Sequence, residues 1–226
     1  MAIDIVTQDI IIDETAGLQD DDVNPNVAPH DNTTVQYLLS LDSVGSGLPD
    51  PQVAFKANFV TATGDAGETI TSVVLAQDSS GTPFSTTVGV NSNIRTVDGN
   101  YVWLFRDPDP TKANVVRGVI GTSNPLTAPA ATGPLAFSFA LISTSNSTAD
   151  LYTVQYVPLF HLDATNPDDQ IDLTNKVFAA ATGTTTVNFS GQNAAPGNHQ
   201  FYLINSPSDA SKQLLVTGFL DRKSVV

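Results

Sequence analysis

The sequence predicts an all-β protein, a β-sandwich of about eleven strands with calcium-bearing loops. Short stretches rich in Val, Ile, Thr and Phe recur along the chain, separated by Gly, Pro, Asn and Asp. This spacing is typical of the strands and turns of a sandwich. Acidic residues gather in the turn-like runs between the stretches instead of following helical faces. Clustered carboxylates on turns are what Ca²⁺ requires, because it takes six to eight oxygen ligands in flexible geometry.

The expected elements follow the chain in order. The strands are predicted at residues 3–12, 35–41, 53–63, 69–77, 101–105, 115–120, 135–142, 151–160, 184–189, 201–204 and 214–219. A Gly-Asp-Ala-Gly turn at 64–67 separates two of them, and Asp98-Gly99-Asn100 predicts a hairpin turn before the strand at 101–105. The Pro-rich stretch 124–134 is expected to be a loop. Helix is not expected beyond short turns near residues 209–211.

Composition narrows the class of protein. A length of 226 residues and a hydrophobic fraction of 41% fit one large all-β domain over residues 1–226, either complete or part of a longer domain. No stretch approaches 18 apolar residues, so no membrane insertion is expected. The chain has 23 Asp and Glu against nine Lys and Arg, a net charge of -14. Nucleic-acid binding is therefore not expected, because phosphate contacts need cationic side chains.

The chain has no Cys, which rules out disulfides and thiolate metal sites within it. Bound Ca²⁺ offers another way to stabilise an extracellular protein, since the ion is plentiful there. The first residues, Met1 to Asp4, lack the basic and apolar regions of a secretory signal.

The acidic segment 163–172 is the strongest candidate metal site. Pro167 fixes the backbone between Asn166 and Asp168, which aims both side chains from one turn. The candidate ligands in this segment are Asp163, Asn166, Asp168, Asp169 and Asp172. The alternative is a turn capped by Asx hydrogen bonds.

Two further acidic runs are candidates for Ca²⁺. In the run Asp20, Asp21 and Asp22, neighbouring side chains of an extended chain alternate in direction, so at most two would serve one ion. Asp107 and Asp109 alternate with prolines and are expected to point the same way, which suits a shared cation. The alternative for both runs is a solvated acidic surface that keeps the protein soluble.

Catalysis has little support in the sequence. There are three His, no Cys and no Gly-x-Ser-x-Gly. Paired carboxylates would suit a glycosidase, but such a site needs an aromatic-walled cleft, and aromatic residues make up only 8% of the chain with a single Trp. We expect no enzymatic activity, and a carbohydrate-active enzyme is the least supported function for this sequence.

Four segments together resemble a module of giant bacterial adhesins of the repeats-in-toxin (RTX) class, which leave the cell by type I secretion. The segments are Ile12 to Val23 (IDETAGLQDDDV), Val115 to Gly121 (VVRGVIG), Thr153 to Asp169 (TVQYVPLFHLDATNPDD) and Leu214 to Gly218 (LLVTG). They occur in the family's order over most of the chain. Leu162 stands where the family usually has Pro, and the Gly-rich nonapeptide calcium repeat is absent.

The resemblance implies an extracellular β-sandwich on the bacterial surface that carries Ca²⁺ and contributes to attachment. Some modules of such adhesins hold a cell-surface or matrix ligand, a glycan or a peptide, through a bound Ca²⁺. Others are structural spacers, or scaffolds that present a binding module and contact neighbouring adhesin domains. The residues leave these roles open.

Overall fold

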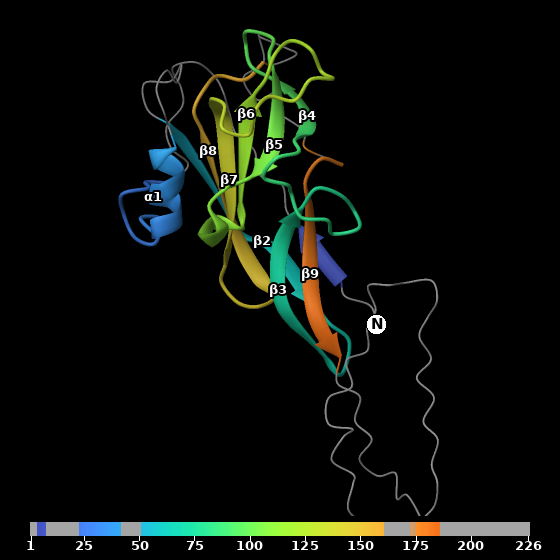
Figure 1. Ribbon diagram of the computed structural model, residues 1–226. Coiled ribbons are helices and arrows are strands. Elements are labelled where there is room, and N and C mark those ends of the chain that lie inside the picture. The colour runs from blue at the N-terminus through green and yellow to red at the C-terminus, as the bar shows by residue number, and fades with distance from the viewer. Residues whose placement is uncertain (1–3, 8–22, 42–50, 161–172, 174, 186–226) are drawn as a thin grey trace, which may run out of the picture.

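The computed structural model of the chain describes residues 4–7, 23–41, 51–160, 173 and 175–185 (Figure 1). These residues form antiparallel strands, one α-helix and one short 3-10 helix, so the expected all-β class is confirmed. The strands are β1 (Asp4–Thr7), β2 (Gln52–Thr63), β3 (Glu68–Ala76), β4 (Val90–Arg95), β5 (Tyr101–Arg106), β6 (Val115–Ile120), β7 (Leu135–Ser143), β8 (Thr148–Gln155) and β9 (Phe178–Thr185). The helix α1 covers Thr33–Ser40, and the 3-10 helix covers Pro110–Lys112.

The described strands form two sheets. Seven of them lie in the order β1-β2-β8-β7-β6-β5-β4, and β3 pairs with β9 in a second sheet. Figure 1 shows the β3–β9 pair in front of the lower part of the large sheet and extending past its end. The turn at 64–67, where Gly67 has a φ of 87°, therefore carries the chain from one sheet to the other instead of closing a hairpin.

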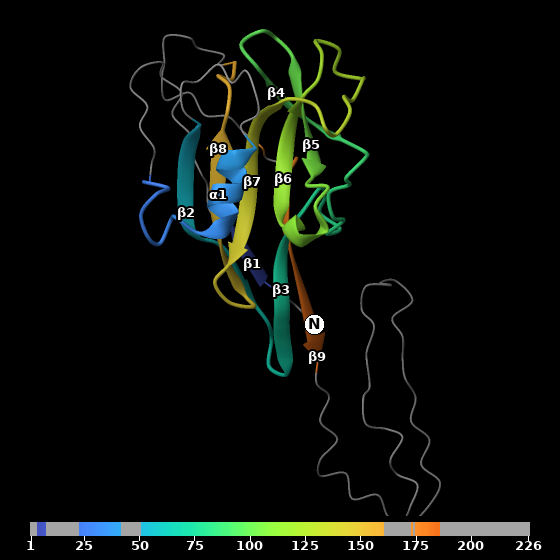
Figure 2. The same cartoon turned by 60° about the vertical axis from the view of Figure 1, so that its left-hand side comes forward.

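Alternate residues of each strand point to opposite faces of the large sheet. Both faces carry buried apolar residues that pack against other parts of the protein. On one face, Leu104 and Phe139 pack in a hydrophobic cluster with Val73 of β3. On the other face, α1 lies over β8 and β7 (Figure 2). Its residues Val35 and Leu38, both fully buried, join a second cluster there. A third, smaller cluster around Trp103 lies near residues 131–135.

The predicted hairpin turn at Asp98-Gly99-Asn100 is confirmed. Gly99 has a φ of 82°, its N–H donates to Thr96 O, and the turn joins β4 to β5. A glycine suits this position because other residues rarely adopt a positive φ. The predicted loop at 124–134 is confirmed as well, since no helix or strand lies between β6 and β7.

The strand predicted at 35–41 is wrong, because α1 occupies these residues. The Asn32 side chain caps the helix: its Oδ1 accepts hydrogen bonds from the backbone N–H groups of Thr34 and Val35, at 3.1 and 3.0 Å. The hydroxyl of Tyr156, which directly follows β8, donates a hydrogen bond to Leu38 O at 2.7 Å. Capping and burial together outweigh the strand preference of the β-branched residues at the start of this segment.

We expect Asn32→Ala to lower the free energy of unfolding by about 1 kcal/mol, because two N-terminal amides of α1 lose their acceptor. Asp31→Ala is the matched control, since Asp31 is an exposed neighbour outside the helix. Urea-unfolding midpoints measure the difference. Equal losses for the two variants would show that the cap does not stabilise α1.

The other strand predictions divide into three groups. Those at 53–63, 69–77, 101–105, 115–120 and 135–142 coincide with β2, β3, β5, β6 and β7. The one at 151–160 matches β8 only in part: β8 ends at Gln155, and residues 156–160 continue to the edge of β4, where Thr96 bridges Leu159. The strand β4 and residues 178–183 of β9 were not expected to be strands. The predictions at 201–204 and 214–219, and most of 3–12 and 184–189, lie outside the described residues.

Candidate functional site

The structure describes two of the ten predicted metal ligands, Asp107 and Asp109. The other eight lie outside the described residues: Asp20, Asp21, Asp22, Asp163, Asn166, Asp168, Asp169 and Asp172. Within the described part of the chain, no group of three or more His, Cys, Asp or Glu side chains is placed to hold a metal ion.

Asp107 is buried in an ion pair. It follows β5 directly and accepts a hydrogen bond at Oδ2 from Arg117 Nε of β6, at 2.6 Å. The same oxygen accepts from the Tyr37 hydroxyl of α1 at 2.7 Å, and Arg117 Nη2 donates to that hydroxyl at 2.9 Å. The Asp107 side chain is 0% exposed and that of Arg117 is 14% exposed. The three side chains tie α1 to the large sheet.

Burial and hydrogen bonding shift the pKa values of Tyr37 and Arg117. Burial raises the pKa of Tyr37, and its hydrogen bond to Asp107 raises it further. For Arg117, burial acts to lower the pKa, but hydrogen bonds to Tyr37 and Asp107 and the charge of Asp107 raise it overall. Tyr37 therefore stays protonated and Arg117 charged over the ordinary pH range. The Asp107 carboxylate has a permanent cation beside it.

Asp109 has a different environment. Its Oδ1 accepts from the backbone N–H and the hydroxyl of Thr111, at 2.8 and 2.7 Å, and so caps the short 3-10 helix. These hydrogen bonds lower the pKa of the Asp109 carboxyl. Its own N–H donates to Asp107 Oδ1 at 2.8 Å. The two carboxylates thus have separate partners, and a cation shared between them stays a prediction. The alternative of a solvated loop does not describe Asp107, which is buried.

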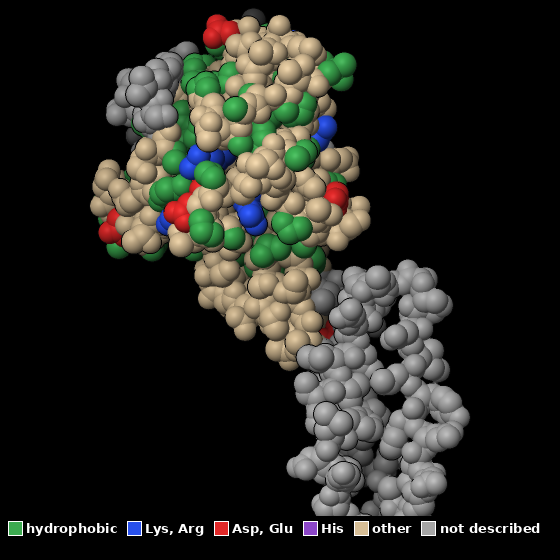
Figure 3. Space-filling model, viewed as in Figure 1, with side chains coloured by type: hydrophobic (Ala, Val, Ile, Leu, Met, Phe, Trp, Pro, Cys, Tyr) green, Lys and Arg blue, Asp and Glu red, His purple; other side chains and the backbone are tan. Residues whose placement is uncertain are grey.

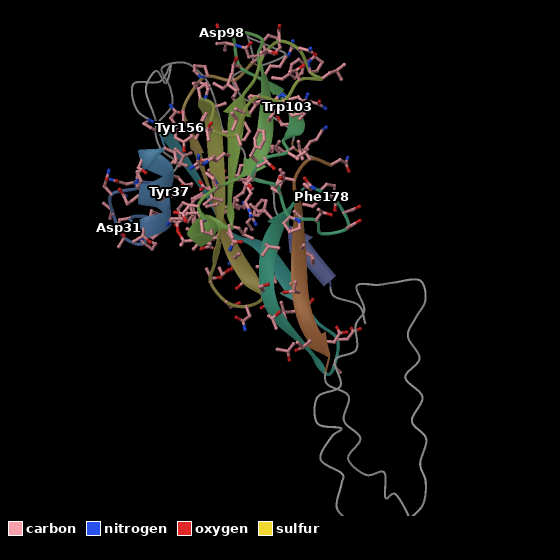
Figure 4. The ribbon with its side chains drawn as sticks, in the orientation of Figure 1. Asp31, Tyr37, Asp98, Trp103, Tyr156 and Phe178 are labelled. Atoms are coloured by element: carbon pink, nitrogen blue, oxygen red, sulfur yellow. The ribbon has the colours of Figure 1, made fainter. Side chains whose placement is uncertain are left out.

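The described His residue is His30, whose Nδ1 lies 2.8 Å from the Tyr152 hydroxyl. Its ring also makes an edge contact with Phe55, at 4.7 Å between centroids. This arrangement packs the segment before α1 onto the sheet. Figure 4 labels Tyr37 on α1 and Tyr156 near the helix, and the Tyr156 hydroxyl donates to Leu38 O of α1.

Both flanks of the acidic segment 161–172 are joined to the body of the protein. Phe160 N–H donates to Arg95 O at 2.7 Å, and the Arg95 guanidinium lies 4.5 Å from the centre of the Phe160 ring. Leu173 packs against the first hydrophobic cluster, and its carbonyl accepts hydrogen bonds from Lys176 and Val177. An ion bound in this segment would therefore be linked to the folded core at both ends.

Charge is distributed unevenly between the described residues and the rest of the sequence. Nine of the 23 acidic residues and six of the nine basic residues lie in the described part. The remaining 14 acidic and three basic residues fall outside it, with six acids in 8–22 and four in 161–172. Figure 3 shows only scattered Asp, Glu, Lys and Arg side chains on the visible face of the described body.

Sequence reasoning missed the partners of Asp107. Arg117 interrupts the otherwise apolar strand β6, and a cation in a buried strand signals a buried anion nearby. That signal was present in the sequence. Tyr37 gave no such signal, since its segment was expected to be a strand.

No protein-family model, no characterised relative and no solved structure matches this chain. A function for the chain therefore has to be proposed from its own residues and geometry.

Proposed function

We propose that this chain is a calcium-dependent extracellular module of a bacterial RTX adhesin. It contributes to attachment to cells or surfaces, either by binding a peptide or glycan ligand or by presenting a module that binds one. The observation that carries the proposal is the concentration of carboxylates in two short segments, 8–22 and 161–172, beside a body with nearly balanced charge.

This distribution favours Ca²⁺ over a solvating surface. A surface that serves solubility would spread its acids over the exposed strands and loops of the body. Here Asp20, Asp21 and Asp22 are consecutive, and Asp168 and Asp169 adjoin. Neighbouring like charges repel unless a cation compensates them. The acidic oxygens, the absence of Cys and the all-β fold fit a hard divalent cation of the extracellular space.

We also propose that the whole domain is a β-sandwich. The large sheet and the β3–β9 pair share the first hydrophobic cluster, which supports face-to-face packing of two sheets. Nine strands lie in the described residues. The strands predicted at 201–204 and 214–219 would bring the number to eleven. The eleven strands expected from the sequence include one at 35–41 that is a helix, and they include neither β4 nor residues 178–183 of β9.

The alternative function is a purely structural spacer. The two functions differ in the coordination of the bound ion: a Ca²⁺ that keeps open positions toward solvent can take a ligand, whereas a fully enclosed ion only stabilises the fold. The neighbouring adhesin domains would be the partners of a spacer. A calcium-replete crystal structure with the coordination shell resolved distinguishes the two.

We expect Asp168→Ala to remove a charged calcium ligand and to lower calcium affinity. The stability loss should be large in millimolar Ca²⁺ and small in excess chelator, because the ligand matters only when the ion is bound. Asp78→Ala is the matched control, since Asp78 is a partly exposed carboxylate of the described body whose Oδ1 caps the turn at residues 78–82. A calorimetric calcium stoichiometry equal to that of the unaltered protein would show that Asp168 is not a ligand.

A further inference from the structure

The edges of the two sheets differ in how they are protected against pairing with another strand. Exposed edges in natural proteins are usually short, bulged, charged or covered, because their free N–H and C=O groups pair readily. At one end of the large sheet, β1 has four residues. At the other end, β4 is irregular at Asn93, whose φ is 66°. It is also covered by residues 159 and 160, through the Thr96–Leu159 bridge and the Phe160–Arg95 hydrogen bond.

The second sheet has one protected strand and one unprotected strand. In β3, Glu68 is charged and an extra residue between Ile70 and Ser72 interrupts the ladder. The strand β9 has eight residues, Phe-Ala-Ala-Ala-Thr-Gly-Thr-Thr, with no charge and no Pro. Among the described residues it pairs with β3 alone, and β1 passes close to it while pairing with β2. Within the described part of the chain, its outer edge therefore has none of the usual protection.

The core beside β9 is also incompletely covered. Val177, Ala179 and Ala181 pack against the first hydrophobic cluster but stay only partly buried. Ala179 and Ala181 have small side chains, so they cover less of this cluster than larger apolar residues would at these positions. A further strand on the edge would supply main-chain hydrogen bonds to β9, and its larger apolar side chains would cover the flank.

We propose that the outer edge of β9 is an acceptor site for a strand formed by residues 214–219 of the same chain. This run, Leu-Leu-Val-Thr-Gly-Phe, is uncharged and contains no Pro. Its length of about 20 Å suits an eight-residue partner better than the four residues 201–204. The connection 186–213 has enough residues for either strand direction, since a chain of this length reaches about 90 Å when fully extended. The proposal concerns strand pairing and does not rest on calcium binding.

The test uses two proline variants, Leu215→Pro and Val216→Pro, made separately in the full chain. Backbone N–H groups of an edge-paired strand alternate in direction, so one of the two variants removes a donor to β9. Ala194→Pro, between the predicted strands, is the matched control. Hydrogen exchange of the β9 amides that point away from β3 should become about tenfold faster in at least one strand variant and stay unchanged in the control. A synthetic peptide of residues 212–221, added in trans, should restore the protection.

The fluorescence of Trp103, the single Trp, reports whether a variant is still folded, because this residue is buried in the third cluster on the large sheet. Unchanged exchange of the outward-pointing β9 amides in both strand variants would overturn the proposal, as would the absence of protection at these amides in the unaltered chain. Protection that disappears on dilution, together with a dimer in sedimentation, would assign the edge to a second copy and would also overturn it.

Discussion

Asp107→Asn is expected to lower the free energy of unfolding by about 3–5 kcal/mol, the usual cost of breaking a buried ion pair by removing one partner. The substitution keeps the size of the side chain but leaves the Arg117 guanidinium without a counterion, and the Asp107 side chain is fully buried. It also weakens the hydrogen bond from Tyr37, so α1 should loosen from the sheet. Urea unfolding, followed by far-ultraviolet circular dichroism, measures the loss.

The double variant Asp107→Asn with Arg117→Met is the control for this interpretation. Removing both charges leaves no unpaired buried ion, so the double variant should be more stable than the sum of the single losses predicts. Asp109→Ala should have a much smaller effect, because its carboxylate only caps an exposed turn. The loss in Asp107→Asn should be equal in Ca²⁺ and in chelator. A loss confined to Ca²⁺ would instead identify Asp107 as a calcium ligand.

Calcium is expected to raise the melting temperature of the unaltered protein by about 5–10 °C. A ligand at 100 times its dissociation constant stabilises the native state by about 2.7 kcal/mol. In a chain of this length each kcal/mol shifts the melting temperature by about 2–4 °C. Because the segment 161–172 is flanked by Phe160 and Leu173, which contact the body, binding there should be coupled to global unfolding. Mg²⁺ should be much less effective, since it demands near-ideal octahedral geometry.

Most of the strands could be predicted because their cores are runs of β-branched and aromatic residues bounded by turn residues. The strand β4 could not, since its sequence Val-Asn-Ser-Asn-Ile-Arg is largely polar. Its buried Ser92 donates a hydrogen bond to Val102 O, and pairing with β5 holds a segment with no strand signal of its own. Tertiary pairing of this kind overrides local preference.

The helix α1 could not be predicted because its first residues favour a strand. Thr33, Thr34 and Val35 favour strand locally, and the helix has only eight residues. It forms because Asn32 caps it and because Val35 and Leu38, three residues apart, are buried together against the sheet. The sequence of this segment alone does not reveal that the large sheet offers an apolar face for Val35 and Leu38.

An acidic run alone cannot distinguish a calcium ligand from half of a buried ion pair. The hydrogen-bond partners of Asp107 are Arg117, ten residues later in the sequence, and Tyr37, seventy residues earlier. Only the fold brings them together. Asp109, two residues away in the same run, points to Thr111 instead. The sequence shows that both positions carry a carboxylate, but it does not show which group each carboxylate contacts.

The most direct test of the proposed function is the amount of calcium bound per chain. Chelator-stripped protein is dialysed to equilibrium against Ca²⁺ between about 0.01 and 10 mM, a range that includes the affinities of extracellular calcium modules, and the bound metal is determined by elemental analysis. The proposal predicts saturable binding of at least one Ca²⁺ per chain, reduced by Asp168→Ala and unchanged by Asp78→Ala. Binding that rises linearly without saturation, with the same melting curve in calcium and in chelator, would contradict it.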